Sequence, residues 1–185
     1  MSLPSFNHAK AAFMVTMCNL MCGFLALVCV TQGWFTEAAV LIILAAVCDS
    51  LDGRIARRGH VVTDMGKELD SLCDIVSFGA APALLVYVQF FAPHMSLVAM
   101  LAALFFVVCG AYRLARFNIS HHPDHFVGIP ITLAGIVLAL LAWLGSGLSG
   151  KVMIAALLIL GVLMISTIKV PKPLHRSIPE EEVSL

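Results

Sequence analysis

Four aspartates at two short spacings are the residues of this sequence best placed to do chemistry. Asp49 and Asp52 are three positions apart, and Asp70 and Asp74 are four positions apart. Side chains three or four positions apart lie on the same face of a helix. Each pair therefore points in one direction if its segment is helical. Two such pairs that meet provide the all-oxygen environment that Mg²⁺, Mn²⁺ and Ca²⁺ prefer and zinc does not.

The charge of these aspartates sets what they can bind. Four ionised carboxylates carry a charge of about −4, which two divalent cations neutralise, and paired cations of this kind stabilise the attacking and leaving oxygens of a phosphoryl transfer. Arg57 follows the first pair, and its guanidinium can grip a phosphate. Gly53 and Gly66 have no side chain, so the backbone can approach a ligand closely. The residues predict metal-dependent chemistry on a phosphorylated substrate.

The aspartates lie at the edges of very apolar segments. Of the 185 residues, 61% are hydrophobic and 12% are charged, whereas soluble domains average about 25% charged. We therefore expect an integral membrane protein, with residues 1–170 forming one membrane domain and 171–185 a disordered cytoplasmic tail. The formal net charge is zero, which argues against a nucleic-acid partner.

Six stretches are apolar enough to approach the roughly 20 residues that a spanning helix needs. They cover residues 13–31, 36–51, 69–91, 96–117, 127–144 and 152–168. Pro82 predicts a kink in the third. The fold expected is therefore all-α: a polytopic membrane protein with six transmembrane helices.

The lysines and arginines orient this arrangement. With six spans, ten of the eleven Lys and Arg residues fall on one side of the membrane, and only Lys151 falls on the other. Because cytoplasmic loops carry the excess of Lys and Arg, both termini are expected in the cytoplasm. The connection that carries the aspartates lies on the same side, so we expect a multi-pass protein of the cell membrane with its site facing the cytoplasm.

The stretch 49–74 resembles the signature of the CDP-alcohol phosphatidyltransferase family, D-x2-D-G-x2-A-R-x8-G-x3-D-x3-D. Every fixed position of the signature matches, namely Asp49, Asp52, Gly53, Ala56, Arg57, Gly66, Asp70 and Asp74. The resemblance implies that the four aspartates hold two Mg²⁺ or Mn²⁺ ions and that Asp74 also acts as the general base. It further implies a CDP site built from Thr16, Asn19, Asp52, Gly53, Ala56, Arg57 and Gly66.

Three further segments are similar to the branch of the family that uses serine as acceptor. They are TMCNLMCGF at 16–24, GAYRLARFN at 110–118 and GIP at 128–130. The resemblance implies an acceptor site for L-serine at Arg113, Arg116 and Asn118. The sequence departs from the pattern at Ile129, where leucine is usual, and at Thr132, where a second proline often stands.

The resemblance also implies the reaction. The hydroxyl of the acceptor attacks the phosphorus that carries the lipid, and CMP leaves. The donor is CDP-diacylglycerol or an archaeal CDP-ether lipid, drawn from the surrounding membrane lipids, and the family implies a homodimer. Arg113 and Arg116 would equally suit the phosphate of glycerol 3-phosphate or inositol phosphate, so another acceptor stays open.

An ion or proton transporter is the alternative from a different class, because transporters also place acids in membrane helices. Transporter acids usually lie near the bilayer midplane on broken helices. The acids of this chain are predicted at a cytoplasmic edge, beside Arg54, Arg57 and Arg58. Their position favours an enzyme.

Overall fold

The computed structural model describes residues 3–59, 63–91, 96–119, 126–145, 147–166 and 169–170. Within these ranges the side chains of 3–12, 52–59, 126–127 and 169–170 are not described. The helices are α1 (Leu3–Thr31), α2 (Phe35–Gly59), α3 (Asp64–Asp74), the π-helical η1 (Ile75–Ala80), α4 (Ala81–Phe91), α5 (Leu97–Ile119), α6 (Ile131–Leu144) and α7 (Gly150–Ile165). The predicted helical class is thus confirmed.

Besides the helices, the structure has a short pair of antiparallel strands at one end of the molecule. β1 (Phe126–Val127) pairs with β2 (Lys169–Val170). The pair occupies the start of the predicted fifth span, whose helix begins at Ile131 rather than near residue 127. Gly128 has a positive φ of 78°, and Pro130, which has no N–H and a fixed φ, is the N-cap of α6. The chain therefore turns before the helix can begin.

The third predicted span lies within a continuous helical stretch from Asp64 to Phe91, which is made of α3, η1 and α4. The π-helical segment ends at Ala80, two residues before Pro82, which has no N–H to donate back to the preceding turn. A π segment within an α-helix often marks a functional site. Here it separates the polar α3, which carries two of the aspartates, from the apolar α4.

Three helical stretches are long and apolar enough to cross a membrane, namely Phe13–Thr31, Asp64–Phe91 and Leu97–Ile119. Two more apolar helices, α6 and α7, are shorter. Large apolar side chains on their outer faces, such as Leu104, Val108 and Ile159, are more than half exposed. Such a surface is unfavourable in water and suits a lipid environment, so the protein is a membrane protein.

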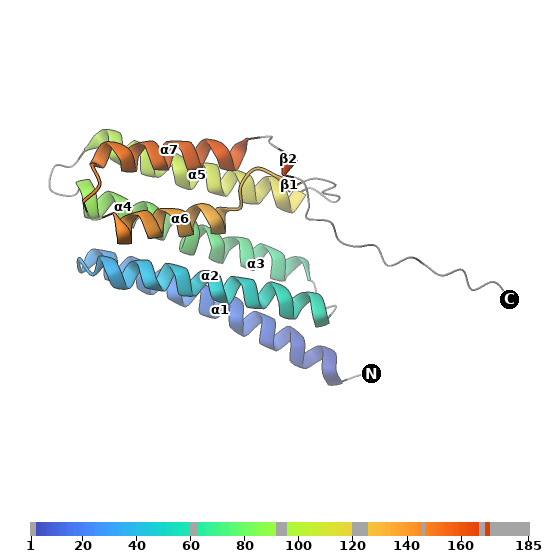
Figure 1. Ribbon diagram of the computed structural model, residues 1–185. Coiled ribbons are helices and arrows are strands. Elements are labelled where there is room, and N and C mark those ends of the chain that lie inside the picture. The colour runs from blue at the N-terminus through green and yellow to red at the C-terminus, as the bar shows by residue number, and fades with distance from the viewer. Residues whose placement is uncertain are drawn as a thin grey trace.

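The helices form a bundle in which α1 and α2 lie side by side and run in opposite directions (Figure 1). Glycines allow the inner helices to approach closely. A Cβ added at Gly135 of α6 would lie 2.7 Å from the backbone oxygen of Phe78, and one added at Gly23 of α1 would lie 2.8 Å from the Cα of Ser77. Small residues at such crossings are typical of membrane bundles. These two glycines allow α1 and α6 to pack closely against η1, which directly follows Asp74.

Candidate active site

The structure brings three of the four predicted aspartates together. Asp49 comes from α2, and Asp70 and Asp74 come from α3. One carboxylate oxygen of each lies within 4.8 Å of the others. Asp74 is buried, and the other two are half-buried. Asp49 lies in the second half of α2, and this half of α2 lies with α3 and the end of α5 toward the same end of the bundle (Figure 1).

Local sequence explains how α3 presents its pair. Thr63 caps the helix, because its Oγ1 accepts a hydrogen bond of 3.1 Å from the backbone N–H of Gly66. A threonine in this position satisfies one of the free donors of the first turn and defines where the helix starts. Asp70 and Asp74 then follow at helical spacing on one face. The predicted geometry of this pair is therefore present.

The donor set of the cluster fits the metals that the sequence predicts. All three side chains are carboxylates, and no thiol or imidazole joins them among the described residues. Oxygen-only ligation is what Mg²⁺ and Mn²⁺ prefer. Three converging carboxylates would also repel one another strongly unless a cation lay between them. The cluster can therefore hold a divalent cation.

Several predicted site residues fall where only the backbone is described. Asp52, Gly53, Ala56 and Arg57 all lie on α2, beyond the described side chains. Asp52 follows Asp49 by three positions on this helix, so the backbone places both on one face. Their contacts stay predictions.

Asn19 of α1 is fully buried and lies against the aspartates. Its Nδ2 donates a hydrogen bond of 3.2 Å to Oδ1 of Asp74, and Ser77 Oγ donates one of 3.0 Å to its backbone oxygen. Within the described part of the chain, the side-chain oxygen of Asn19 has no hydrogen-bond partner. A buried acceptor without a donor is costly. Asn19 thus holds one oxygen of Asp74 in place, and Thr16, one turn earlier on α1, is also buried.

The predicted acceptor residues lie in the last turns of α5. Arg113 is half-buried, and it is near enough to Asp74 for the two charges to attract each other. Asn118 Nδ2 donates a hydrogen bond of 3.0 Å to Ser71 Oγ, and its contact with serine stays a prediction. This bond ties the end of α5 to α3, between the two aspartates of that helix. Arg113 is therefore adjacent to the cluster, and Asn118 holds the two helices together.

Sequence analysis missed the role of Thr132, which it noted only as a departure from the family pattern. Thr132 is in the first turn of α6, and its Oγ1 donates a hydrogen bond of 3.4 Å to Oδ2 of Asp49. Ser71 was missed too, although a polar side chain next to Asp70 was a signal that could have found it. Thr132 contacts the cluster from α6, and Ser71 joins α3 to the end of α5 through Asn118.

Replacing Thr132 with valine should weaken metal binding while keeping the fold. Valine has nearly the same shape but has no hydroxyl, so Asp49 would lose this donor. We expect the concentration of Mg²⁺ or Mn²⁺ that gives half-maximal activity to rise by about tenfold, the low end for partners that orient metal ligands. Thr132→Ser, which keeps the hydroxyl, is the matched control. Equal metal requirements in the valine and serine variants would show that the bond does not matter.

Comparison with known proteins identifies the family. The family model described as CDP-alcohol phosphatidyltransferase matches residues 9–165. This chain belongs to the CDP-alcohol phosphatidyltransferase family. The resemblance found in the signature is thus confirmed, and it extends over all the helices of the bundle. Members of this family are metal-dependent phosphotransferases, so the chain is an enzyme and not a transporter, and its three-aspartate cluster could hold a metal ion.

Curated relatives of this CDP-alcohol phosphatidyltransferase carry names that specify an acceptor. The chain is 41% identical over 158 residues to the CDP-diacylglycerol–serine O-phosphatidyltransferase of Methanocaldococcus jannaschii, covering 85% of this chain and 72% of the relative. It is 36% identical over 166 residues to the protein of the same name from Bacillus subtilis, covering 85% and 88%. It is 34% identical over 163 residues to the archaetidylserine synthase of Methanothermobacter thermautotrophicus, covering 86% and 68%.

Proposed function

We propose that this chain transfers a phosphatidyl group from a CDP-activated lipid to L-serine and releases CMP, as a step of phospholipid biosynthesis. The observation that carries the proposal is the three-aspartate cluster beside Arg113 in a chain of this family. The names of the relatives from Methanocaldococcus jannaschii and Bacillus subtilis support serine as the acceptor. The donor is CDP-diacylglycerol or its ether-linked counterpart, the second being supported by the archaetidylserine synthase.

The residues of the cluster divide the chemistry between them. In the proposed reaction the serine hydroxyl oxygen forms a bond to the phosphorus that carries the lipid, and the bond from that phosphorus to the oxygen of CMP breaks. Asp74 accepts the hydroxyl proton, because a serine hydroxyl is a weak nucleophile until a base removes its proton. Asn19 holds the Asp74 carboxylate in place through its 3.2 Å hydrogen bond.

Asp49, Asp52, Asp70 and Asp74 are proposed to hold two Mg²⁺ or Mn²⁺ ions. Bound there, the metals supply the positive charge that offsets the diphosphate and the departing CMP. Thr132 orients the carboxylate of Asp49 from α6. On the nucleotide side, Gly53, Ala56, Arg57 and Gly66 are proposed to line the CDP with Thr16 and Asn19, whose polar side chains are buried.

The acceptor side is proposed to lie at the end of α5. Serine brings a carboxylate, which an arginine binds through two parallel hydrogen bonds. Arg113 has a buried Nε with no hydrogen-bond partner in the described residues, so a donor is available next to the cluster. Arg116 is one turn further along, in the last turn of the same helix. Asn118, near the end of α5, is proposed to bind serine together with the two arginines, and its hydrogen bond to Ser71 connects this site to α3.

Arg116→Ala should raise the KM for serine by about tenfold, in line with the loss of one charge-assisted interaction. The KM for the CDP-lipid should change much less, because Arg116 lies on the acceptor side. Initial rates at varied concentrations of each substrate measure both constants. Lys67→Ala, which removes one exposed positive charge from α3, is the control. A larger rise in the KM for the CDP-lipid would assign Arg116 to the nucleotide instead.

The membrane arrangement is proposed to have six spans, with both termini and the active site in the cytoplasm. Two observations support it. The ends of α2 and α5 and the helix α3, which carries Asp70 and Asp74, lie toward one end of the bundle (Figure 1). In a six-span arrangement, ten of the eleven Lys and Arg residues would fall on that side. A C-terminal fluorescent fusion should fold and fluoresce, whereas an active C-terminal alkaline phosphatase fusion would contradict the orientation.

Two further proposals rest on the sequence and the family. Residues 1–170 are proposed to form the catalytic membrane domain and 171–185 a cytoplasmic tail, which lies outside the described residues. The enzyme is proposed to be a homodimer. Truncation after residue 170 should leave activity intact, and light scattering of the detergent-solubilised protein should give the mass of two chains. Lost activity or a monomer mass would contradict the respective proposal.

The transfer itself is tested with membranes that contain the chain. Labelled serine should enter the lipid fraction only when a CDP-lipid and a divalent cation are both present. Incorporation that does not depend on the CDP-lipid would contradict the proposed donor.

A further inference from the structure

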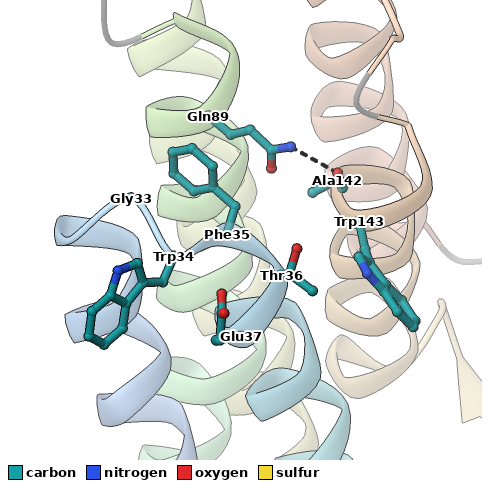
Figure 2. Close-up of a pocket in the computed structure, with 8 residues that line it drawn as sticks. All are labelled: Gly33, Trp34, Phe35, Thr36, Glu37, Gln89, Ala142 and Trp143. Atoms are coloured by element: carbon teal, nitrogen blue, oxygen red, sulfur yellow. Dashed lines mark hydrogen bonds between the residues drawn. The ribbon is translucent and has the colours of Figure 1, made fainter.

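A polar cavity lies at the other end of α2 from Asp49. It has a volume of about 480 Å³ and is found where the turn between α1 and α2 meets the last turns of α4 and α6 (Figure 2). Glu37 lines it from the first turn of α2. Asp49 is twelve residues further along that helix, which corresponds to about 18 Å. The cavity is therefore separate from the candidate active site.

Gln89 lines this cavity from α4, and a hydrogen bond fixes the orientation of its amide. Gln89 Nε2 donates a hydrogen bond of 3.0 Å to the backbone oxygen of Ala142. A flipped amide would bring two acceptors together, so this bond determines which atom is the oxygen. The oxygen is buried and has no hydrogen-bond partner in the part of the chain that the structure describes. An unpaired buried acceptor costs stability, which a ligand that donates a hydrogen bond would recover.

Two other oxygen-bearing side chains point toward the same space. Figure 2 shows the Gln89 oxygen directed down from α4, and the hydroxyl of Thr36 and the carboxylate of Glu37 directed up from α2. A carboxylate in the first turn of a helix is favourable without any ligand, so Glu37 alone would indicate nothing. The fixed and unpaired Gln89 oxygen facing it is the independent observation. Together they form a set of converging acceptors.

The lining defines the chemistry of the ligand. None of the eight described residues that line the cavity is a lysine, arginine or histidine, and Glu37 supplies one negative charge. The complementary group has one positive charge and several N–H donors, which describes a primary ammonium. The cavity is also much larger than a bare metal ion requires. It therefore suits an ammonium carried by a molecule of headgroup size.

The surroundings of the cavity indicate where such a molecule comes from. Trp34 and Trp143 flank it, and both are substantially exposed, at 58% and 43%. Tryptophans concentrate at the depth of the lipid headgroups, where one end of the ring is in the apolar layer and the other in water. We propose that this cavity binds the primary ammonium headgroup of an aminophospholipid at the membrane face opposite the active site.

Native mass spectrometry of the full chain in detergent tests the proposal. The protein is incubated with phosphatidylethanolamine, with phosphatidylcholine of the same acyl chains, or with free ethanolamine. Choline has the same charge but no N–H donor, so phosphatidylethanolamine should be retained in clear preference. Glu37→Gln should weaken that retention by about tenfold, as expected for the loss of a charged acceptor. Thr36→Val, which keeps the side-chain shape, should weaken it by a smaller factor.

Glu68→Gln is the matched control, because it removes one exposed carboxylate from α3 at the other end of the bundle. It should retain phosphatidylethanolamine like the unmodified protein. Free ethanolamine that binds as tightly as the lipid would support the ammonium chemistry but make a soluble amine the ligand. Equal retention of phosphatidylethanolamine and phosphatidylcholine, or equal behaviour of the Glu37 and Glu68 variants, would overturn the proposal. Neither result depends on transfer to serine.

Discussion

Replacing Asp74 with asparagine should lower kcat by at least about a thousandfold, within the range that a general base contributes to a rate. Asparagine is nearly the same size but cannot accept the proton of the attacking hydroxyl. Asp74 is also the most buried member of the cluster and the one held by Asn19. Asn19 and the surrounding packing thus orient the Asp74 carboxylate. The substitution removes the proton acceptor with little change in packing.

Two measurements separate the base role of Asp74 from a metal-binding role. Binding of the CDP-lipid, followed by equilibrium titration in the presence of Mg²⁺ or Mn²⁺, should fall by only a few-fold in Asp74→Asn. Asp64→Asn, an exposed acid in the first turn of the same helix, is the control and should keep both binding and turnover. Parallel losses of binding and turnover in Asp74→Asn would argue that Asp74 acts only through the metals.

Removing the divalent cation should abolish activity, and Asp70→Ala should raise the metal concentration needed to restore activity. We expect chelator to reduce the rate to background and Mg²⁺ or Mn²⁺ to restore it, because the clustered carboxylates repel one another and the substrate diphosphate when no cation is present. Loss of the Asp70 oxygen should raise the required metal concentration by about a hundredfold, the upper part of the range for changes around a metal site.

Glu68→Gln, an exposed carboxylate two residues before Asp70, is the control for the metal requirement. It should respond to metal as the unmodified enzyme does. Metal titrations of the purified variants measure the effect. Full activity in excess chelator would end the hypothesis that the aspartates work through divalent cations.

The sequence alone predicted the helical class and the meeting of Asp70 and Asp74 on one face. These features follow from local rules, since composition determines the class and helical spacing determines the face. The approach of Asp49 to that pair also followed from the signature, and the structure brings all three together. Which substrate atoms each carboxylate serves stays a prediction.

The contacts that orient the cluster could not be predicted, because they join residues far apart in the chain. Thr132 and Asp49 are 83 positions apart, and Asn19 and Asp74 are 55 apart. No periodicity within a single helix encodes such a pairing, which depends on how closely glycines allow the helices to pack. The hydrogen bond between Asn118 and Ser71 is a third example, because these residues are 47 positions apart in the chain.

The predicted spans differ from the helices mainly where the chain leaves the bundle. α6 begins after Pro130, and α7 ends at Ile165, before the predicted limit at residue 168. Hydropathy measures how apolar a stretch is, but turn geometry at Gly128 and Pro130 decides where the helix starts. The cavity at Gln89 could not be predicted from the sequence either. A neutral glutamine in an apolar segment does not indicate a binding site until the structure shows that its oxygen lacks a hydrogen-bond partner among the described residues.

An acceptor panel with the purified enzyme is the most direct test of the account. The enzyme is given a CDP-lipid, a divalent cation and one of four acceptors: serine, glycerol 3-phosphate, inositol phosphate or glycerol. CMP release and the lipid product are both measured. The account predicts CMP release with serine and phosphatidylserine, or its ether-linked equivalent, as the product. CMP release with glycerol 3-phosphate or inositol phosphate in place of serine would contradict it.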